Sequence, residues 1–407
     1  MQYMYRESSE SSGELVRRFK ILKSYLEPFM MPESHGMRRN ELFPVHHIKK
    51  GKTMRTFIAV MAAASLLICL GCQKESPSAP QSTMKGTWTA KTNPYLQEVR
   101  HIQYLPDKNI LAVSGVPVEG RPGLQFFNIA DNQWIAPPEN TPLQQIFTMS
   151  YNTGSALYAV MFSSAESAGQ VLVSIDNGTS WSDPLILPEN TDPRCVTLAG
   201  ENSAVMLLGT INHGVYLSED SGTTWMTPET PPDNPGIQGF AVDSGDPSHI
   251  LAGTRIGLCE SRDGGVNWQA VTNRFSNESV FVVEVVAHPR KAGVFTLIYR
   301  TAEGAAMVLR STDTGQTWTP IRNGLFGDAQ PRCVVFHPES DTTAYIGTVY
   351  DGIYKTESMG DQWVPINNGL PVEKPIIIHC MEFVPGTPGA LMAGSNLDGQ
   401  LFELTDY

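Results

Sequence analysis

The sequence predicts an all-β protein built as a seven-bladed β-propeller, with four antiparallel strands in each blade. Tryptophans recur at positions 134, 181, 225, 268, 318 and 363, at intervals of 43 to 50 residues. Repeats of about 40–45 residues that carry several short strands are typical of propeller blades. A turn motif precedes most of these tryptophans, and the region lacks a sustained 3.6-residue apolar period, which argues against helices.

The turn motif has the form Ser-x-Asp-x-Gly-x-x-Trp, with copies at 174–181, 218–225, 261–268 and 311–318. A fifth copy, at 356–363, lacks the Asp, and the stretch that ends at Trp134 keeps little more than the Trp. Asp accepts backbone hydrogen bonds in turns, Gly adopts positive φ, and Trp buries a large ring. Because a catalytic site is built once, we interpret the repeated residues as structural: Asp176, Asp220, Asp263, Asp313, Trp181, Trp225, Trp268, Trp318 and Trp363.

The strands of one repeat are predicted at 237–244, 249–254, 257–263 and 267–273. After Trp363 the chain offers only three strands, at 376–385, 390–395 and 399–407, whereas residues 85–92 resemble a fourth strand without a blade. We therefore predict that the N-terminal strand closes the last blade and leaves no free sheet edge. Residues 85–407 then form one seven-bladed domain.

Residues 54–71 have the features of a secretion signal, with a basic start, a short apolar run and Gly71 before Cys72. The ending Cys-Leu-Gly-Cys resembles a bacterial lipobox, with Cys69 where that family usually has Leu. We predict lipidation of Cys72, a flexible tether over 72–84, and a place in the cell envelope. Gln73 favours the outer membrane, and the periplasmic face and the cell surface both remain compatible. Residues 1–53 are interpreted as untranslated leader ahead of a true start at Met54, or alternatively as a disordered extension.

The charge balance argues against nucleic acid as a partner. The chain has 29 basic and 41 acidic residues; without residues 1–71, which hold 11 basic and 6 acidic ones, the net charge is −17. Cys195, Cys259, Cys333 and Cys380 show no zinc or redox spacing, so we predict no metal site. We also predict no cofactor and a monomeric protein. A Cys333–Cys380 disulfide would suit an oxidising compartment, but first strands of adjacent blades are expected to lie too far apart for it.

The first strand of each blade lines the channel of a propeller. Aligning these strands places Arg100, Arg194, Arg332 and His379 at one level, with Gln238, Gln145 and Val283 in the remaining places. A guanidinium suits carboxylate or phosphate recognition, and a channel mouth focuses its field. We predict a mouth that binds an acidic peptide or acidic sugar. Alternatively, the arginines pair with Asp192, Asp328 and Glu382. Loops after the second strands add weaker candidates: His213, Arg255, Arg300, Glu303, Tyr350, Asp351 and Asp398.

The turn motif resembles the Asp-box of sialidases, xyloglucan hydrolases, sortilin-like receptors and photosystem II stability/assembly factor propellers. Residues 250–268 and 345–363 resemble the last group and the xyloglucan enzymes most closely. A sialidase would have six blades and an Arg-Ile-Pro motif, whereas this chain has Arg100-His101-Ile102 at the comparable place. Enzymes of the xyloglucan type have two propellers, and sortilin-type receptors have ten blades. The assembly-factor type implies a single exported propeller whose arginines bind a partner without catalysis. A non-catalytic binding scaffold is the prediction, and a glycoside hydrolase or glycan-binding protein is the alternative.

Overall fold

The computed structural model describes residues 86–405 except 94, 139–140, 142–143, 153–155, 164–167, 184, 200–204, 233–235, 272–279, 326–328 and 387–388. Every regular element in this part of the chain is a β-strand. No helix there is long and apolar enough to cross a membrane. The predicted leader, signal segment, lipidated Cys72 and tether lie outside the described residues.

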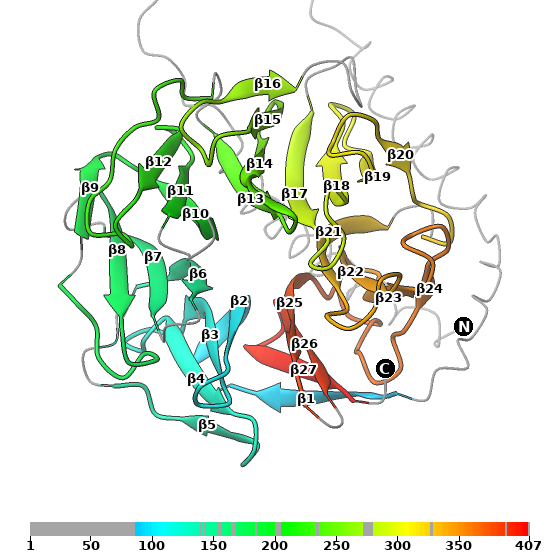
Figure 1. Ribbon diagram of the computed structural model, residues 1–407. Helices are drawn as coiled ribbons and strands as arrows, with labels where there is room; N and C mark the ends of the chain where they lie inside the picture. Colours follow the sequence, from blue (N-terminus) through cyan, green and yellow to red (C-terminus); the bar gives the residue numbers. More distant parts are fainter. Residues whose placement is uncertain are drawn as a thin grey trace, which may run out of the picture. The chain divides into compact units, whose positions relative to one another are not determined.

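Seven sheets follow one another around a central axis (Figure 1). Blade 1 holds β2 (Leu96–Leu105), β3 (Ile110–Pro117), β4 (Leu124–Asn128) and β5 (Gln133–Ile135). Blade 2 holds β6 (Ile146–Tyr151), β7 (Leu157–Ser163), β8 (Ala168–Ser174) and β9 (Leu185–Glu189). Blade 3 holds β10 (Pro193–Ala199), β11 (Val205–Thr210) and β12 (Val215–Ser218). Blade 4 holds β13 (Ile237–Asp243), β14 (Asp246–Thr254), β15 (Gly257–Ser261) and β16 (Gln269–Val271).

The remaining blades continue the same order. Blade 5 holds β17 (Phe281–Ala287), β18 (Phe295–Arg300), β19 (Ala306–Ser311) and β20 (Thr319–Pro320). Blade 6 holds β21 (Gln330–Phe336), β22 (Ala344–Val349), β23 (Ile353–Thr356) and β24 (Val364–Pro365). Blade 7 holds β25 (Ile378–Val384), β26 (Ala390–Ser395), β27 (Gln400–Leu404) and β1 (Trp88–Thr92). The predicted all-β propeller of seven blades is therefore confirmed.

The fourth position of blade 3 is reduced to an antiparallel bridge between Leu217 and Met226. The chain continues from Met226 as Thr-Pro-Glu-Thr-Pro-Pro, and prolines have no N–H to donate to a neighbouring strand. The other six sheets each have four strands.

The N-terminal strand closes the ring, as predicted. β1 pairs antiparallel with β27, from Trp88 opposite Leu404 to Thr92 opposite Gln400. The indole Nε1 of Trp88 donates to the carbonyl of Ile366 at 2.7 Å, and its backbone N–H donates to the carbonyl of Asn368 at 2.9 Å. Trp88 therefore ties blade 7 to the end of blade 6 as well as completing the sheet.

The repeated aspartates hold turns. In one copy Ser218 Oγ donates to Asp220 Oδ1 at 2.9 Å and accepts from Gly222 N at 2.8 Å, while Asp220 accepts from both the backbone and the hydroxyl of Thr224, at 2.8 and 2.7 Å. These bonds lower the pKa of Asp220. The copies at Asp176, Asp263 and Asp313 repeat the arrangement. These carboxylates are committed to the backbone of their own turns.

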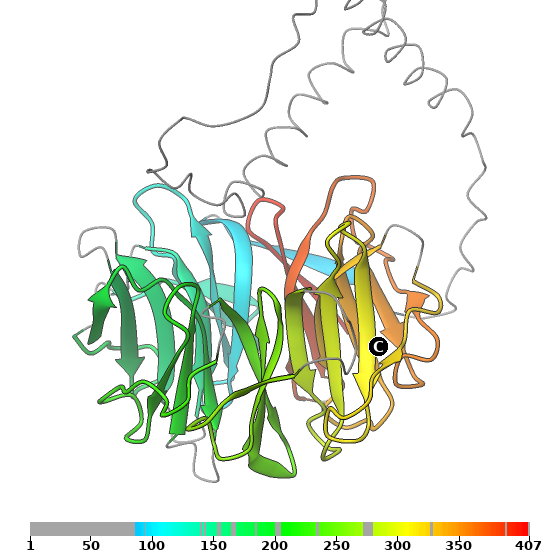
Figure 2. The same ribbon diagram turned by 90° about the horizontal axis from the view of Figure 1, so that it is seen from above.

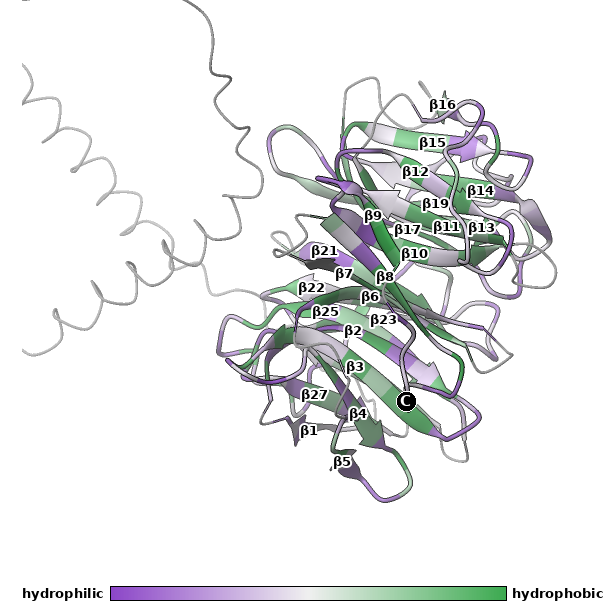
Figure 3. Cartoon of the chain, turned by 90° about the vertical axis from the view of Figure 1, so that its left-hand side faces the viewer, coloured by the Kyte–Doolittle hydropathy of each residue, from purple (hydrophilic) through white to green (hydrophobic). Residues whose placement is uncertain are grey.

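The core is divided among the seven contacts between blades. Seven apolar clusters occur in the described residues, and each joins side chains of two neighbouring blades. Figure 3 shows apolar residues concentrated in the strands, whereas the connecting turns are mostly hydrophilic. Because each blade packs mainly on its neighbours, the inner strands can give polar side chains to the channel without breaking a central core.

Candidate functional site

Every inner strand contains a β-bulge near its start. At each bulge the pairing with the second strand skips one residue. A bulged residue leaves the ladder and its side chain is re-aimed. The seven bulged residues, which we call the bulge ring, are Arg100, Phe147, Arg194, Gln238, Val283, Arg332 and His379.

The bulge ring contains the polar residues that the sequence alignment placed at one level. In blade 2 the position belongs to Phe147 and not to Gln145, which precedes β6. The inner strands run along the ring axis (Figure 2), so their starts share one end, here called the bulge mouth. Since neighbouring strands are antiparallel, the loops between second and third strands lie at this end and the Ser-x-Asp turns at the other.

A chain of polar contacts crosses three adjacent blades at the bulge mouth. Arg332 Nε donates to His379 Nδ1 at 3.1 Å, which places the histidine proton on Nε2. This Nε2 faces Glu98 Oε2 at 3.6 Å, and Glu98 also forms an ion pair with Arg100. Burial, then Arg332 and Arg100, hold the pKa of His379 well below its ordinary value, so the imidazole is neutral.

Arg332 remains charged although it lies inside the ring. Burial, followed by the positive charges of Arg100 and Arg194, lowers its pKa to about 10. The influence of these two residues on one group shows that three predicted arginines share one electrostatic environment. The sequence analysis missed Glu98, whose only signal was its position two residues before Arg100 on a strand.

Arg194 has unused hydrogen-bonding capacity at the bulge mouth. Its side chain is exposed to water, and within the described part of the chain it makes no direct hydrogen bond or ion pair. The surrounding protein lowers its pKa, and Arg100 and Arg255 act in the same direction while Asp192 opposes them. Five N–H donors of a guanidinium therefore face the channel without a protein acceptor.

The carboxylates expected to neutralise the ring do so only in part. Asp192 lies within electrostatic reach of Arg194 and Arg255, and burial raises its pKa. Glu382 instead accepts from the backbone N–H of Tyr104 at 3.4 Å, and burial raises its pKa to about 7. Asp328 lies outside the described residues. The direct carboxylate partner at the mouth is Glu98, on Arg100.

Two loop arginines extend the cationic region. Arg255 follows β14 and acts on Arg194, whereas Arg300 ends β18 and acts on Arg332. The Nε atoms of both are buried and have no hydrogen-bond partner among the residues described. Burial lowers the pKa of Arg300. Five arginines, on blades 1, 3, 4, 5 and 6, thus surround the bulge mouth.

The loops at this mouth share one scaffold and differ at their tips. Thr210 Oγ1 donates to the carbonyl of Gly214 at 2.9 Å, and Thr348 Oγ1 donates to that of Gly352 at 2.8 Å. In blade 4, Thr254 Oγ1 donates to the carbonyl of Gly257 at 2.9 Å. The tip residues His213, Arg255, Glu303, Tyr350, Asp351 and Asp398 vary on this fixed frame, which is the arrangement expected of binding loops.

Glu284, which follows Val283 on β17, is a second carboxyl that the sequence analysis missed. Its Oε2 accepts from the backbone N–H of Val334 at 2.6 Å and so joins blade 5 to blade 6. Burial raises its pKa to about 8, against the opposing effects of the Val334 bond and of Arg332.

In the described residues no group of three His, Cys, Asp or Glu side chains could hold a metal ion. Cys195, Cys259, Cys333 and Cys380 are free thiols, so Cys333 and Cys380 form no disulfide.

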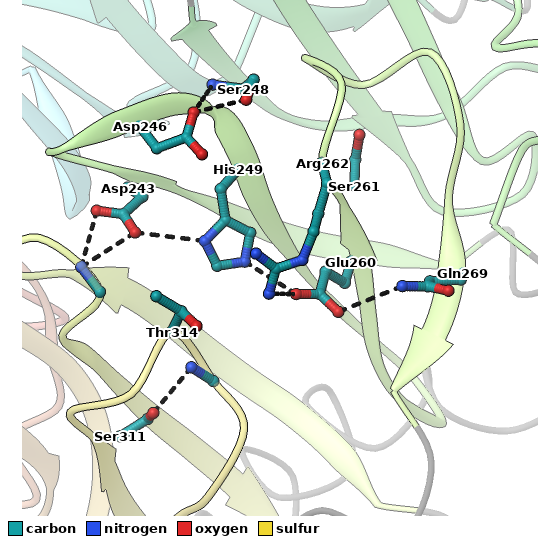
Figure 4. Close-up of polar contacts among 12 residues, drawn as sticks. Asp243, Asp246, Ser248, His249, Glu260, Ser261, Arg262, Gln269, Ser311 and Thr314 are labelled. Atoms are coloured by element: carbon teal, nitrogen blue, oxygen red, sulfur yellow. Dashed lines mark hydrogen bonds and ion pairs between the residues drawn. The ribbon is translucent and has the colours of Figure 1, made fainter.

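A separate buried cluster (Figure 4) lies in blade 4 around Asp243, the last residue of β13, whose first residues lie at the bulge mouth. His249 Nδ1 is 3.3 Å from Asp243 Oδ2, and its Nε2 is 3.0 Å from Glu260 Oε1. Asp243 also accepts from the backbone N–H of Gly293 in blade 5, at 2.9 Å, and Glu260 accepts from Arg262. The imidazole therefore bridges two buried carboxyl groups of blade 4, and Asp243 connects this cluster to blade 5.

Comparisons with known proteins identify relatives of the fold. No protein-family profile matches the chain, and no curated protein is similar to it in sequence. An ancestral GH74 enzyme superimposes with a TM-score of 0.61 at 14% identity over 76% of this chain and 45% of that one. YCF48 bound to D1 peptide gives 0.57 at 15%, over 78% and 94%. YCF48 from Cyanidioschyzon merolae gives 0.57 at 15%, over 78% and 98%.

The propeller is similar in fold to both groups. At these identities the likeness concerns the fold alone. The chain spans less than half of the GH74 enzyme and nearly all of each YCF48 chain.

Proposed function

We propose that this protein is a non-catalytic binding or assembly scaffold that recognises an anionic peptide segment at the bulge mouth. The observation that carries the proposal is the position of Arg194, a guanidinium held inside the ring without a direct protein partner in the described chain. It stands with Arg100, Arg255, Arg300 and Arg332 in a protein whose net charge is −12. Such a concentration of one sign, against the charge of the whole chain, favours an anionic ligand.

A carboxylate is the ligand chemistry that these groups favour. A guanidinium binds a carboxylate through two parallel hydrogen bonds, and such bonds strengthen where water is partly excluded. The buried Nε atoms of Arg255 and Arg300 would gain acceptors from a bound carboxylate. Neutral His379 contributes no charge, but it holds the Nε of Arg332 and leaves the outer nitrogens of that guanidinium for a ligand.

A peptide is favoured over other anions by two further arguments. One related propeller of nearly the same extent is described as YCF48 bound to D1 peptide. The Asp-box resemblance of residues 85–407 points toward assembly-factor propellers as well. The rigid loops with varied tips would then read the side chains that flank the carboxylate.

We further propose that the mature protein is attached to the cell envelope through a lipid on Cys72. The signal-like segment 54–71 and the Cys that follows it support this. Wild-type protein expressed from its native gene is expected to partition into detergent, whereas Cys72→Ser should appear in the aqueous phase. Equal partitioning of the two would refute the anchor.

The binding proposal is tested with purified residues 73–407, a fluorescein-labelled Glu-Glu-Ala peptide with a free carboxyl end, and solubilised native envelope. Arg194→Ala is expected to weaken peptide binding about tenfold, the loss of one charge-assisted pair, without changing the unfolding midpoint. Arg290→Ala is the matched control, because Arg290 pairs with Asp341 at 2.9 Å on the half-exposed surface of the other end. Equal affinity of wild type and Arg194→Ala would refute the site.

Glycan binding or glycoside hydrolysis is the alternative, and Glu284 is the observation that favours it. A carboxyl whose pKa is raised to about 8 beside Arg332 has the protonation state of a general acid at neutral pH. Its Oε2, however, already accepts from Val334. Hydrolysis of an acidic oligosaccharide by wild type, abolished in Glu284→Gln, would replace the scaffold proposal with an enzymatic one.

A further inference from the structure

Tyr350 has an unusual backbone conformation at the bulge mouth. Its φ is 81°, in the left-handed region that bulky residues rarely adopt. The other described non-glycine residues with positive φ have ordinary explanations. Asn109, Asn132, Asn177, Asn190 and Asp398 are residue types that tolerate this region, and Ser221, Thr314 and Met359 occupy one shared position of the repeated turn. Tyr350 belongs to neither group.

The surrounding backbone fixes this conformation. The N–H of Tyr350 donates to the carbonyl of Ile376 at 2.7 Å. The preceding residue, Val349, pairs with Gln330 on one side and bridges Ile377 on the other. Gln330 and Ile377 each stand two residues before a member of the bulge ring, Arg332 and His379 respectively. The loop tip is therefore clamped between the two strands that carry the Arg332–His379 contact.

The side chain of Tyr350 is only partly buried, so its packing offsets little of the backbone strain. It is 45% exposed, the one exposed aromatic side chain among those whose burial the structure describes. Its hydroxyl has no hydrogen-bond partner in the described residues. A glycine or asparagine would meet the demand of the loop without strain, and backbone strain that packing does not explain is concentrated at binding sites.

We propose that Tyr350 is a preformed aromatic contact at the bulge mouth that receives the apolar or aromatic side chain beside the carboxylate of the bound peptide. The inference rests on the proposed anion site and adds its specificity. The arginines would bind any acidic segment. The ring of Tyr350, beside the strands that carry Arg332 and His379, would select those segments that have an apolar residue next to the carboxylate. Rigid aromatic surface provides such a contact at low entropic cost.

The test uses two labelled peptides with free carboxyl ends, Glu-Glu-Phe and Glu-Glu-Ala, against wild type, Tyr350→Phe, Tyr350→Ala and Tyr350→Gly. Wild type and Tyr350→Phe are expected to bind Glu-Glu-Phe about tenfold more tightly than Glu-Glu-Ala, as one buried aromatic contact would give. Tyr350→Ala and Tyr350→Gly should lose this preference and keep the weaker affinity for Glu-Glu-Ala. Tyr350→Gly should unfold at a higher urea concentration than Tyr350→Ala, because it relieves the positive φ.

The outcomes separate this inference from the proposed function. Equal binding of the two peptides by wild type, with about tenfold weaker binding of both by Arg194→Ala, would overturn the role of Tyr350 and leave the anion site standing. Retention of the preference in Tyr350→Gly would also overturn it. Failure of wild type to bind either peptide would overturn both proposals. Asp398→Gly, which relieves positive φ in the corresponding loop of blade 7, is the matched control and should leave the preference unchanged.

Discussion

Replacing His249 with alanine is expected to lower the free energy of unfolding by about 3 kcal/mol. The histidine is 1% exposed and stands between Asp243 and Glu260, which are equally buried. Removing one member of a buried ion pair typically costs 3–5 kcal/mol, because the remaining charge loses its partner. Here each carboxylate keeps other donors, the N–H groups of Gly245 and Gly293 for Asp243 and the guanidinium of Arg262 for Glu260. The expected loss therefore lies near the lower end of that range.

Urea unfolding followed by tryptophan fluorescence measures this change. His213→Ala is the matched control, since His213 is exposed and its Nδ1 faces only Asn212 Oδ1, at 3.0 Å; it should change stability by less than about 0.5 kcal/mol. A His249→Ala/Glu260→Gln double variant should regain part of the loss by removing one of the two buried charges. A loss below about 1 kcal/mol in His249→Ala would refute the view that His249 stabilises blade 4 by bridging Asp243 and Glu260.

Three further predictions concern the turns, the channel and the ring closure. Asp220→Ala should lower the urea midpoint of unfolding and leave peptide affinity unchanged; loss of affinity at an unchanged midpoint would contradict a structural role. Burial raises the pKa of Glu284 from 4.5 to about 8, so the folded state keeps a proton that the unfolded state releases between these values, and stability falls as the pH rises through this window. Glu284→Gln keeps an acceptor for Val334 and should remove about 2 kcal/mol of that fall in stability between pH 5 and 8.5. This is less than the full linkage value because water screens the charge. An unchanged dependence of stability on pH would contradict the raised pKa of Glu284. Trp88→Ala should cost about 3–4 kcal/mol, because the indole is 2% exposed and donates to Ile366; a loss under 1 kcal/mol would show that β1 does not secure the ring.

The fold could be predicted because its information is local and repeated. Each Ser-x-Asp-x-Gly-x-x-Trp copy specifies one turn by side-chain bonds to its own backbone, as Asp220 and Ser218 show. The missing fourth strand near the C-terminus and the spare strand at residues 85–92 together implied the closure. The shortened edge of blade 3 was harder to predict. Pro228 indicated that regular pairing would stop there, but a proline does not indicate which path the chain takes instead.

The site could be predicted only as far as the repeat allowed. Aligned strands brought Arg100, Arg194 and Arg332 to one level, but the bulges that aim their side chains leave no mark in the sequence, and blade 2 was misaligned at Gln145 for that reason. Glu98 and Glu284 were missed because their roles depend on contacts between blades, which no single repeat contains.

The residues proposed to recognise the ligand are those that differ from one repeat to the next. The bulge ring repeats one backbone feature seven times, yet its side chains run from arginine through glutamine to valine and phenylalanine. Identical side chains at seven positions would be expected of a structural ring, as the turn residues illustrate. The variation therefore makes the ring uneven: Arg332, His379 and Arg100 stand on adjacent blades and Arg194 on blade 3, whereas the apolar residues Phe147 and Val283 occupy blades 2 and 5. A ligand that fits this mouth must itself be asymmetric, with its carboxylate and its apolar part in fixed order, which is why two peptides that differ only beside the carboxylate form the sharpest test.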